Sequence, residues 1–229
     1  MNKKAVIILS GGLDSSTCLS LALNEGFEVY PLTFTYGQRH DKEVEHANKI
    51  INYYEIQNHK IVDISFLGSI GGSALTDKNI EVPTIESKDN IPNTYVPARN
   101  MIFLSLASAY AEVIGADAIF TGVSAVDYSG YPDCRPEFID SMNKTINLAT
   151  KQGVTGGEII IRTPLISLTK TETINLGIEL GTPYQLTTSC YNGRDKACGK
   201  CDSCLLRLRG FKDAGHKDPI EYEESNILI

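Results

Sequence analysis

The chain has 229 residues and a mass of 25.1 kDa, and its 42% hydrophobic and 21% charged residues are typical of a globular protein. Its net charge of -7 opposes a nucleic-acid partner held by phosphate neutralisation. The longest apolar stretch, residues 101–120, is interrupted by Glu112 and Asp117 and is too short for a membrane span. The apolar run near the N-terminus is too brief for a signal peptide, so we expect a cytoplasmic protein without a membrane partner.

The first part of the chain alternates apolar β-type runs with amphipathic helical segments. Strands are predicted over 4–9, 27–34 and 59–64, and helices over 15–25 and 41–55. This alternation is typical of parallel strands joined by right-handed crossovers.

The second part continues the pattern after a Gly- and Pro-rich segment, 65–98, which we expect to be a long loop. Asn100 is expected to cap a helix over 101–115. The predicted elements that follow are a strand over 117–122, a loop over 123–138, a helix to about residue 150, a strand over 158–165 and a helix over 169–181. We therefore expect a doubly wound, mostly parallel, Rossmann-like sheet, residues 1–185. A C-terminal segment, 186–229, is expected to pack on it as part of the same structural unit.

The stretch SGGLDSSTC, Ser10 to Cys18, follows the first predicted strand and opens the first helix. Glycine lets the backbone approach an anion, and the N–H groups at a helix start favour a phosphate there. The stretch lacks the lysine of the Walker A loop and the spacing of G-x-G-x-x-G. Asp14 would repel phosphates unless a cation intervenes, which suggests Mg²⁺. The alternative is a plain tight turn in which Asp14 only stabilises the helix start.

Four cysteines are crowded near the C-terminus, at Cys190, Cys198, Cys201 and Cys204. The spacing C-x₇-C-x₂-C-x₂-C can bring four thiolates together, and it predicts a Zn²⁺ site. Four sulfur ligands leave no open position, so the metal is expected to be structural and to hold a helix that starts near Asp202. An iron–sulfur cluster and reduced thiols are the alternatives.

Two motifs resemble those of the PP-loop ATP pyrophosphatases: SGGxDS in the first loop, and TPLISLTKTET over 163–173. The resemblance implies an adenine nucleotide alpha hydrolase-like fold that cleaves ATP between the α and β phosphates. It implies that Lys170 reaches the phosphates, although a solvated helix-start lysine is the alternative. The ATP-binding residues it implies are Leu9, Ser10, Gly11, Gly12, Leu13, Asp14, Ser15, Ser16, Thr17, Cys18 and Leu19.

Further motifs occur in order from about residue 4 to 219: TFTYGQRH, YVPARNMIFLSLASAYAE, DYSGYPDCRPEF, SCYNG and CGKCDSCLLRLRGF. Together they resemble the 7-cyano-7-deazaguanine synthase family. The resemblance implies a ligase that turns the carboxylate of 7-carboxy-7-deazaguanine into a nitrile with ammonia and two ATP, and it suggests a homodimer. The chain has no room for a glutaminase domain beside the sheet, so free ammonia is the expected nitrogen donor.

Three residues are expected to act on the phosphates: Asp14, Arg99 and Lys170. The loop over 127–138 is the predicted deazaguanine pocket, because carboxylates can accept from the base edge and rings can stack on it. Its candidate residues are Asp127, Tyr128, Tyr131, Asp133, Arg135, Glu137 and Phe138. The alternative for each of them alone is an ordinary loop residue, which the turn-forming composition favours, and for Arg99 it is a surface ion-pair partner.

Two residues have open roles. Cys134 can be a nucleophile, although activation by adenylation requires none, and His40 can be a general base or simply begin a helix. Two rival functions also remain at this stage: a tRNA-modifying member of the same superfamily, against which the acidic charge argues, and a nucleotide-binding protein without turnover.

Overall fold

The computed structural model describes residues 3–38, 42–77, 79–82, 91–126 and 130–223. Five strands form one parallel sheet in the order β3-β2-β1-β4-β5. Their bounds are β1 (Lys4–Ile8), β2 (Glu28–Thr35), β3 (Lys60–Asp63), β4 (Ala118–Phe120) and β5 (Ile160–Arg162). The predicted doubly wound parallel sheet is thus confirmed.

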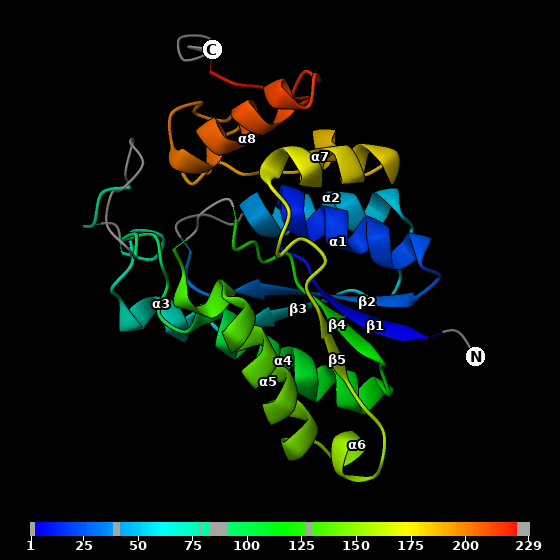
Figure 1. Cartoon of the computed structure of the whole chain (residues 1–229). Coiled ribbons are helices and arrows are strands. Elements are labelled where there is room, and N and C mark those ends of the chain that lie inside the picture. Colours follow the sequence, from blue (N-terminus) through cyan, green and yellow to red (C-terminus); the bar gives the residue numbers. More distant parts are fainter. Residues whose placement is uncertain (1–2, 39–41, 78, 83–90, 127–129, 224–229) are drawn as a thin grey trace.

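The central strand β1 is buried on both faces. Ala5 and Ile7 face the helices α1 (Leu13–Asn24) and α2 (Lys42–Tyr53). Val6 and Ile8 face α4 (Arg99–Ile114) and α5 (Pro136–Ala149), on the opposite side of the sheet (Figure 1). Because successive side chains of a strand point to opposite faces, an uninterrupted apolar run is what a doubly covered strand requires.

The strand order reverses between β1 and β4. The chain passes from β1 to β2 through α1 on one face, and reaches β4 through α4 on the other. The loops that follow β1 and β4 therefore diverge at the carboxyl edge of the sheet, which is where doubly wound sheets bind ligands. Both loops contain residues that the sequence marks as functional.

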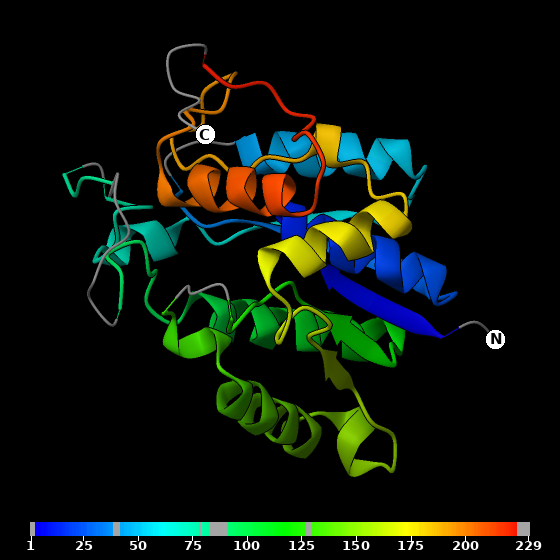
Figure 2. The same cartoon turned by 45° about the horizontal axis from the view of Figure 1, so that its top comes forward.

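The C-terminal part packs over α1 through α7 (Lys170–Glu179) and α8 (Asp202–Asp213), which come forward in Figure 2. The short 3₁₀ turn η2 (Tyr184–Leu186) lies between these two helices in sequence. α7 contacts both α1 and α8, so the cysteine-bearing segment lies against the sheet domain. The boundary at residue 185 stays a prediction. In the described ranges, no helix has the length and apolar character needed to cross a membrane.

Several boundaries differ from the predictions. The predicted long loop contains α3 (Phe66–Ile70), where Leu67 is buried, and the short elements α6 (Lys151–Val154) and η1 (Pro132–Cys134) were not predicted. The prediction that Asn100 caps α4 is wrong, because the helix begins one residue earlier at Arg99. α1 begins at Leu13, which brings Asp14 into its first turn.

Candidate active site

The loop between β1 and α1 depends on a glycine that no other residue replaces. Gly11 has φ of +77°, in the left-handed region, and a Cβ there would lie 2.5 Å from the carbonyl oxygen of Glu43 and 2.6 Å from the amide of Ala47. Both atoms belong to the backbone of α2, so they cannot give way. The loop is therefore pressed directly against α2.

Gly11→Ala is expected to destabilise the protein and to abolish ATP binding, because it adds left-handed strain of about 1–2 kcal/mol and a backbone collision. The matched control is Gly26→Ala, where φ is +81° but nothing lies within 4 Å of the new Cβ. Thermal unfolding and ATP titration calorimetry compare the two. Equal losses in both variants would mean that the contact with α2 is unimportant.

Serine hydroxyls fix the shape of this loop. The Oγ atoms of Ser10 and Ser15 lie 3.0 Å apart, and the hydroxyls of Ser15 and Ser16 donate to the carbonyl oxygen of Gly12 at 3.1 and 2.7 Å. Gly12 is the N-cap of α1 and offers no side-chain cap. The N–H groups of the first helical turn have no partner within a helix, so they face the loop as donors for an anion. The rest of the predicted ATP segment is mainly core: Leu9, Leu13, Ser16, Thr17, Cys18 and Leu19 are buried.

Asp14 and Lys170 meet across the mouth of this loop. The Nζ of Lys170, the first residue of α7, donates to Oδ1 of Asp14 at 2.6 Å. The lysine side chain is 11% exposed and the aspartate 32%, so the pair is accessible from one side. The two residues lie 156 positions apart in sequence, so it is the fold that brings them together.

The end of β4 closes the other side of the loop. A Cβ on Gly122 would lie 2.9 Å from both the carbonyl carbon of Asp14 and the amide nitrogen of Ser15. Only a glycine lets the two diverging loops approach so closely. The first turn of α1 is therefore held at the point where the strand order reverses.

Arg99 lies in an aromatic enclosure near the end of β2. Its guanidinium carbon lies 5.7 Å from the ring centre of Tyr36 and 5.9 Å from that of Tyr131. In the part of the chain that the structure describes, no carboxylate lies within ion-pair distance of it, and its buried Nε has no hydrogen-bond partner. Burial raises the pKa of both tyrosines, which stay neutral. The Nη1 of Arg99 donates to the hydroxyl of Tyr36 at 3.5 Å, and the carboxylates of Glu43 and Asp133 act on it only from beyond ion-pair distance, so the guanidinium is suited to an anionic ligand.

The carboxylate of Asp133 binds the backbone of α4, whereas the sequence suggested that it could read the base edge of the substrate. It is buried, and one carboxylate oxygen accepts the backbone N–H of Asn100 at 2.9 Å. Burial raises its pKa, and the hydrogen bond from Asn100 partly opposes this effect. α4 has no side-chain cap of its own and begins after Ala98, which has φ of +57°. Asp133 therefore accepts a backbone N–H of the first turn of α4 from outside the helix. It thereby fixes the neighbouring Arg99.

The other predicted pocket residues are dispersed. Tyr131 donates to Oγ1 of Thr94 at 2.9 Å. Arg135 is exposed and donates from Nε to the carbonyl oxygen of Pro132 at 3.1 Å. Glu137 is exposed in the first turn of α5, and Phe138 packs partly against the core below α4. Three residues, Asp127, Tyr128 and His40, lie outside the described residues.

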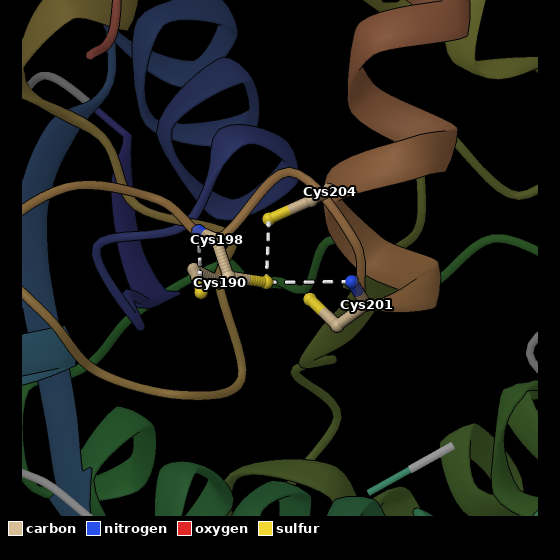
Figure 3. A group of neighbouring side chains, drawn as sticks. All are labelled: Cys190, Cys198, Cys201 and Cys204. Carbon is tan, nitrogen blue, oxygen red and sulfur yellow. Dashed lines mark hydrogen bonds between the residues drawn. The ribbon is translucent and has the colours of Figure 1, made fainter. Parts of the chain in front are cut away.

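The four C-terminal cysteines converge as their spacing predicts. Their Sγ atoms all lie within 4.8 Å of one another, all four are buried, and all are reduced (Figure 3). Cys204 comes from the first turn of α8, and the other three come from the segment that precedes it. The cluster could hold one metal ion.

The surroundings of the sulfur atoms suit thiolates. Backbone N–H groups point at them: Cys198 donates to Cys190 Sγ at 3.4 Å, and Cys201 to Cys198 Sγ at 3.3 Å. Hydrogen bonds from Cys201 and Cys204 hold the pKa of the Cys190 thiol well below its ordinary value. The hydrogen bond between Cys190 and Cys201 in turn raises the pKa of Cys201 to about 12. Thiolates that accept backbone hydrogen bonds are the ligand type that a closed tetrahedral metal site uses.

The sequence missed two residues of this site, namely Gly122 and Thr188, and it offered Tyr36 only as part of the motif TFTYGQRH. Gly122 had a readable signal, because a glycine at the carboxyl end of a strand often marks a close approach. Thr188 had none: its N–H donates to the carbonyl oxygen of Gly11 at 3.0 Å, a contact that only the tertiary fold creates.

Comparisons with known proteins identify the family of this chain. Residues 4–215 match the family described as queuosine biosynthesis protein QueC. A 7-cyano-7-deazaguanine synthase of Acetivibrio thermocellus is 61% identical over 222 residues, which are 97% of this chain and 99% of that protein. The corresponding protein of Coxiella burnetii is 53% identical over 222 residues, 96% of this chain and 98% of the relative.

A solved structure supports the fold alone. The NMN synthetase from Francisella tularensis matches with a TM-score of 0.50 and 19% sequence identity, over 94% of this chain and 79% of that one. The specific likeness comes from the curated relatives, which align over nearly their whole length and carry one name. The chain belongs to the 7-cyano-7-deazaguanine synthase family of queuosine biosynthesis proteins.

Proposed function

We propose that this protein is an ATP-dependent carbon–nitrogen ligase that converts 7-carboxy-7-deazaguanine and ammonia into 7-cyano-7-deazaguanine. The observation that carries the proposal is the backbone-lined loop at the start of α1, faced by Asp14 and Lys170. This loop offers N–H donors and a lysine to the β and γ phosphates of ATP, which leave together as pyrophosphate.

The chemistry proceeds through two activations. The substrate carboxylate attacks the α-phosphorus of ATP, which releases pyrophosphate and leaves an acyl adenylate. Ammonia then adds to the acyl carbon and AMP leaves, which gives the amide. The amide oxygen attacks a second ATP, again with loss of pyrophosphate. The nitrogen then gives up both of its protons and AMP leaves, which gives the nitrile.

The residues of the chain have separate tasks in this sequence. Lys170 offsets the charge of the departing pyrophosphate from the loop side. Arg99 offsets charge on the α-phosphate and the reacting carboxylate, because its guanidinium has no carboxylate partner among the described residues. Tyr131 lies beside Arg99, so the loop over 127–138 is our choice for the deazaguanine pocket. Its proposed members remain Asp127, Tyr128, Tyr131, Asp133, Arg135, Glu137 and Phe138, with Asp133 acting through α4.

Two metals fit the residues present. The four buried thiols, two of which receive backbone N–H bonds, suit Zn²⁺, which would hold the C-terminal segment together and take no part in the reaction. Asp14 pairs with Lys170 and its side chain is 32% exposed, so its carboxylate can serve Mg²⁺ that arrives with ATP. Mg²⁺ would supply neutralisation of phosphate charge.

The direct test incubates the metal-loaded protein with ATP, Mg²⁺, ammonium and 7-carboxy-7-deazaguanine. Mass spectrometry is expected to show the nitrile and two AMP per nitrile. Absence of product from well-folded protein would refute the assignment. AMP release that requires tRNA would instead favour the tRNA-modifying alternative.

Arg99→Lys is expected to lower kcat by about 10²-fold, because a lysine lacks the planar fork and the stacking surface between the two tyrosines. The matched control is Arg162→Lys, since Arg162 also lies over an aromatic ring, that of Phe120 at 5.1 Å, but it pairs with Glu25. Steady-state AMP release measures both. A kcat for Arg99→Lys within threefold of the parent protein would remove Arg99 from the reaction.

The remaining parts of the proposal concern the nitrogen donor, the cellular location and the oligomeric state. We propose free ammonia as the nitrogen donor, a cytoplasmic location and a homodimer. Gel filtration with light scattering is expected to give twice the chain mass of 25.1 kDa.

A further inference from the structure

The C-terminal segment contains a fully buried charge pair that the reaction scheme does not use. Arg207 of α8 and Asp218 have side chains that are only 1% and 3% exposed. Arg207 donates from Nε to Oδ2 at 2.8 Å and from Nη2 to Oδ1 at 3.0 Å. Such a pair contributes little net stability, so its presence at this depth calls for another reason.

The same guanidinium also holds a second segment. Its Nη1 donates to the hydroxyls of Thr187 and Ser189 at 2.7 and 3.3 Å, and its Nη2 donates to the carbonyl oxygen of Tyr184 at 3.2 Å. All three guanidinium nitrogens are therefore engaged, and the planar fork fixes residues 184–189 relative to α8.

Residues 184–189 are attached directly to the phosphate loop. Thr188 donates its N–H to the carbonyl oxygen of Gly11 at 3.0 Å and forms a parallel β-bridge with Gly12. The hydroxyl of Tyr184 lies 2.8 Å from Oγ1 of Thr17 in α1. A displacement of this segment would therefore move the backbone that forms the anion site.

The next turn of α8 supports the other side of the site. A Cβ on Gly210 would lie 2.7 Å from Cγ of Lys170 and 2.8 Å from Cδ1 of Ile174, so α8 rests on the stem of the phosphate lysine. Phe211 packs edge-on against Tyr184, with ring centres 5.6 Å apart. Arg207, Gly210 and Phe211 have the i, i+3, i+4 spacing of one helix face.

We propose that Arg207 is a positioning residue of the ATP site. Through Arg207 and Gly210, α8 acts as a rigid support, here called the splint, that fixes the phosphate loop and Lys170 in position relative to each other. This inference rests on the proposed function, since it assigns ATP to that loop. The C-terminal cysteine segment then contributes to ATP binding in addition to stability.

Arg207→Lys tests the inference, because lysine keeps a charge beside Asp218 but cannot reach Asp218, Thr187 and the Tyr184 carbonyl at once. The expected result is a Kd for ATP at least tenfold higher by calorimetry, with metal content retained. The KM for the carboxylate substrate is expected to change less than threefold. A purely structural role would lower Tm and leave the ATP affinity of the folded protein unchanged. That result would overturn the proposal.

Arg209→Lys is the matched control, since Arg209 is exposed on the same helix, and it is expected to bind ATP as the parent protein does. If Arg207→Lys does not fold, Thr187→Val removes one acceptor at nearly constant volume. It is expected to raise the Kd for ATP at least threefold, and an unchanged Kd refutes the inference.

Gly210→Ala tests the lysine side of the splint. It is expected to lower kcat at least tenfold while ATP still binds, because the new methyl group displaces Lys170, and an unchanged kcat would contradict this side of the proposal. The proposed function and the proposed role of α8 can be refuted independently of each other. A parent protein that makes no nitrile refutes the proposed function, whereas variants with parental ATP affinity in an active protein refute only the splint.

Discussion

Replacing Lys170 with methionine is expected to reduce AMP release by about 10²–10³-fold, because it removes one preorganised positive group from the phosphate site. Methionine keeps most of the stem that packs beneath Gly210, so the fold should persist. Asp14 is 32% exposed and regains water when its partner at 2.6 Å is lost, which limits the loss of stability to about 1 kcal/mol. AMP release in the presence of both substrates, together with Tm, measures the two effects.

Lys49→Met is the control for this variant. It breaks the surface pair between Lys49 and Glu45, 2.7 Å apart on α2, and is expected to change neither AMP release nor Tm measurably. Asp14→Ala should likewise abolish AMP release and leave the fold intact. If Lys170→Met kept its rate within threefold, Lys170 would be only an ion-pair partner at a helix start.

Replacing Cys201 with serine is expected to lower metal content and thermal stability together. Loss of a structural metal is among the few single changes that cost about 4 kcal/mol or more. For a chain of this size, such a loss corresponds to a fall in Tm of about 8–16 °C. The other three thiols would retain a metal only weakly, because a closed site needs all four ligands. Metal analysis and differential scanning calorimetry on the same sample give the answer.

Cys134→Ser is the matched control, since Cys134 is a buried thiol outside the cluster. Its Sγ accepts from Nδ2 of Asn100 at 3.2 Å, and a serine oxygen can accept the same bond. This variant is expected to keep its metal, and to keep AMP release within a few-fold because adenylation supplies the leaving group without a nucleophile. A Cys201→Ser protein with full metal content and unchanged Tm would contradict a structural metal site.

The sequence predicts the sheet well because its strands are buried on both faces. The run AVII of β1 is apolar at every position, which only a doubly covered strand needs, and the glycines of the first loop follow it at once. The cysteine spacing likewise predicts the cluster, since three of its ligands lie within seven residues of one another. In both places, the residues concerned are close together in sequence, so their spacing predicts how they lie in space.

Helix boundaries were predicted less well where a distant residue decides them. Asn100 looks like a cap in sequence, yet α4 begins at Arg99, because Asp133 accepts the Asn100 N–H from another loop. The short helix α3 is held by burial of Leu67 rather than by a periodic pattern. Neither contact leaves a signal that single-sequence patterning can read.

The sequence by itself determined the parallel sheet, the glycine-rich turn after β1 and the four-cysteine cluster, because each depends on residues close together in the chain. Only the tertiary structure decided that Asp14 meets Lys170, that Arg99 lies between Tyr36 and Tyr131, and that Arg207 holds the segment paired with the loop. Those contacts join residues far apart in sequence. Their geometry is fixed by how the helices pack, which local propensity does not encode.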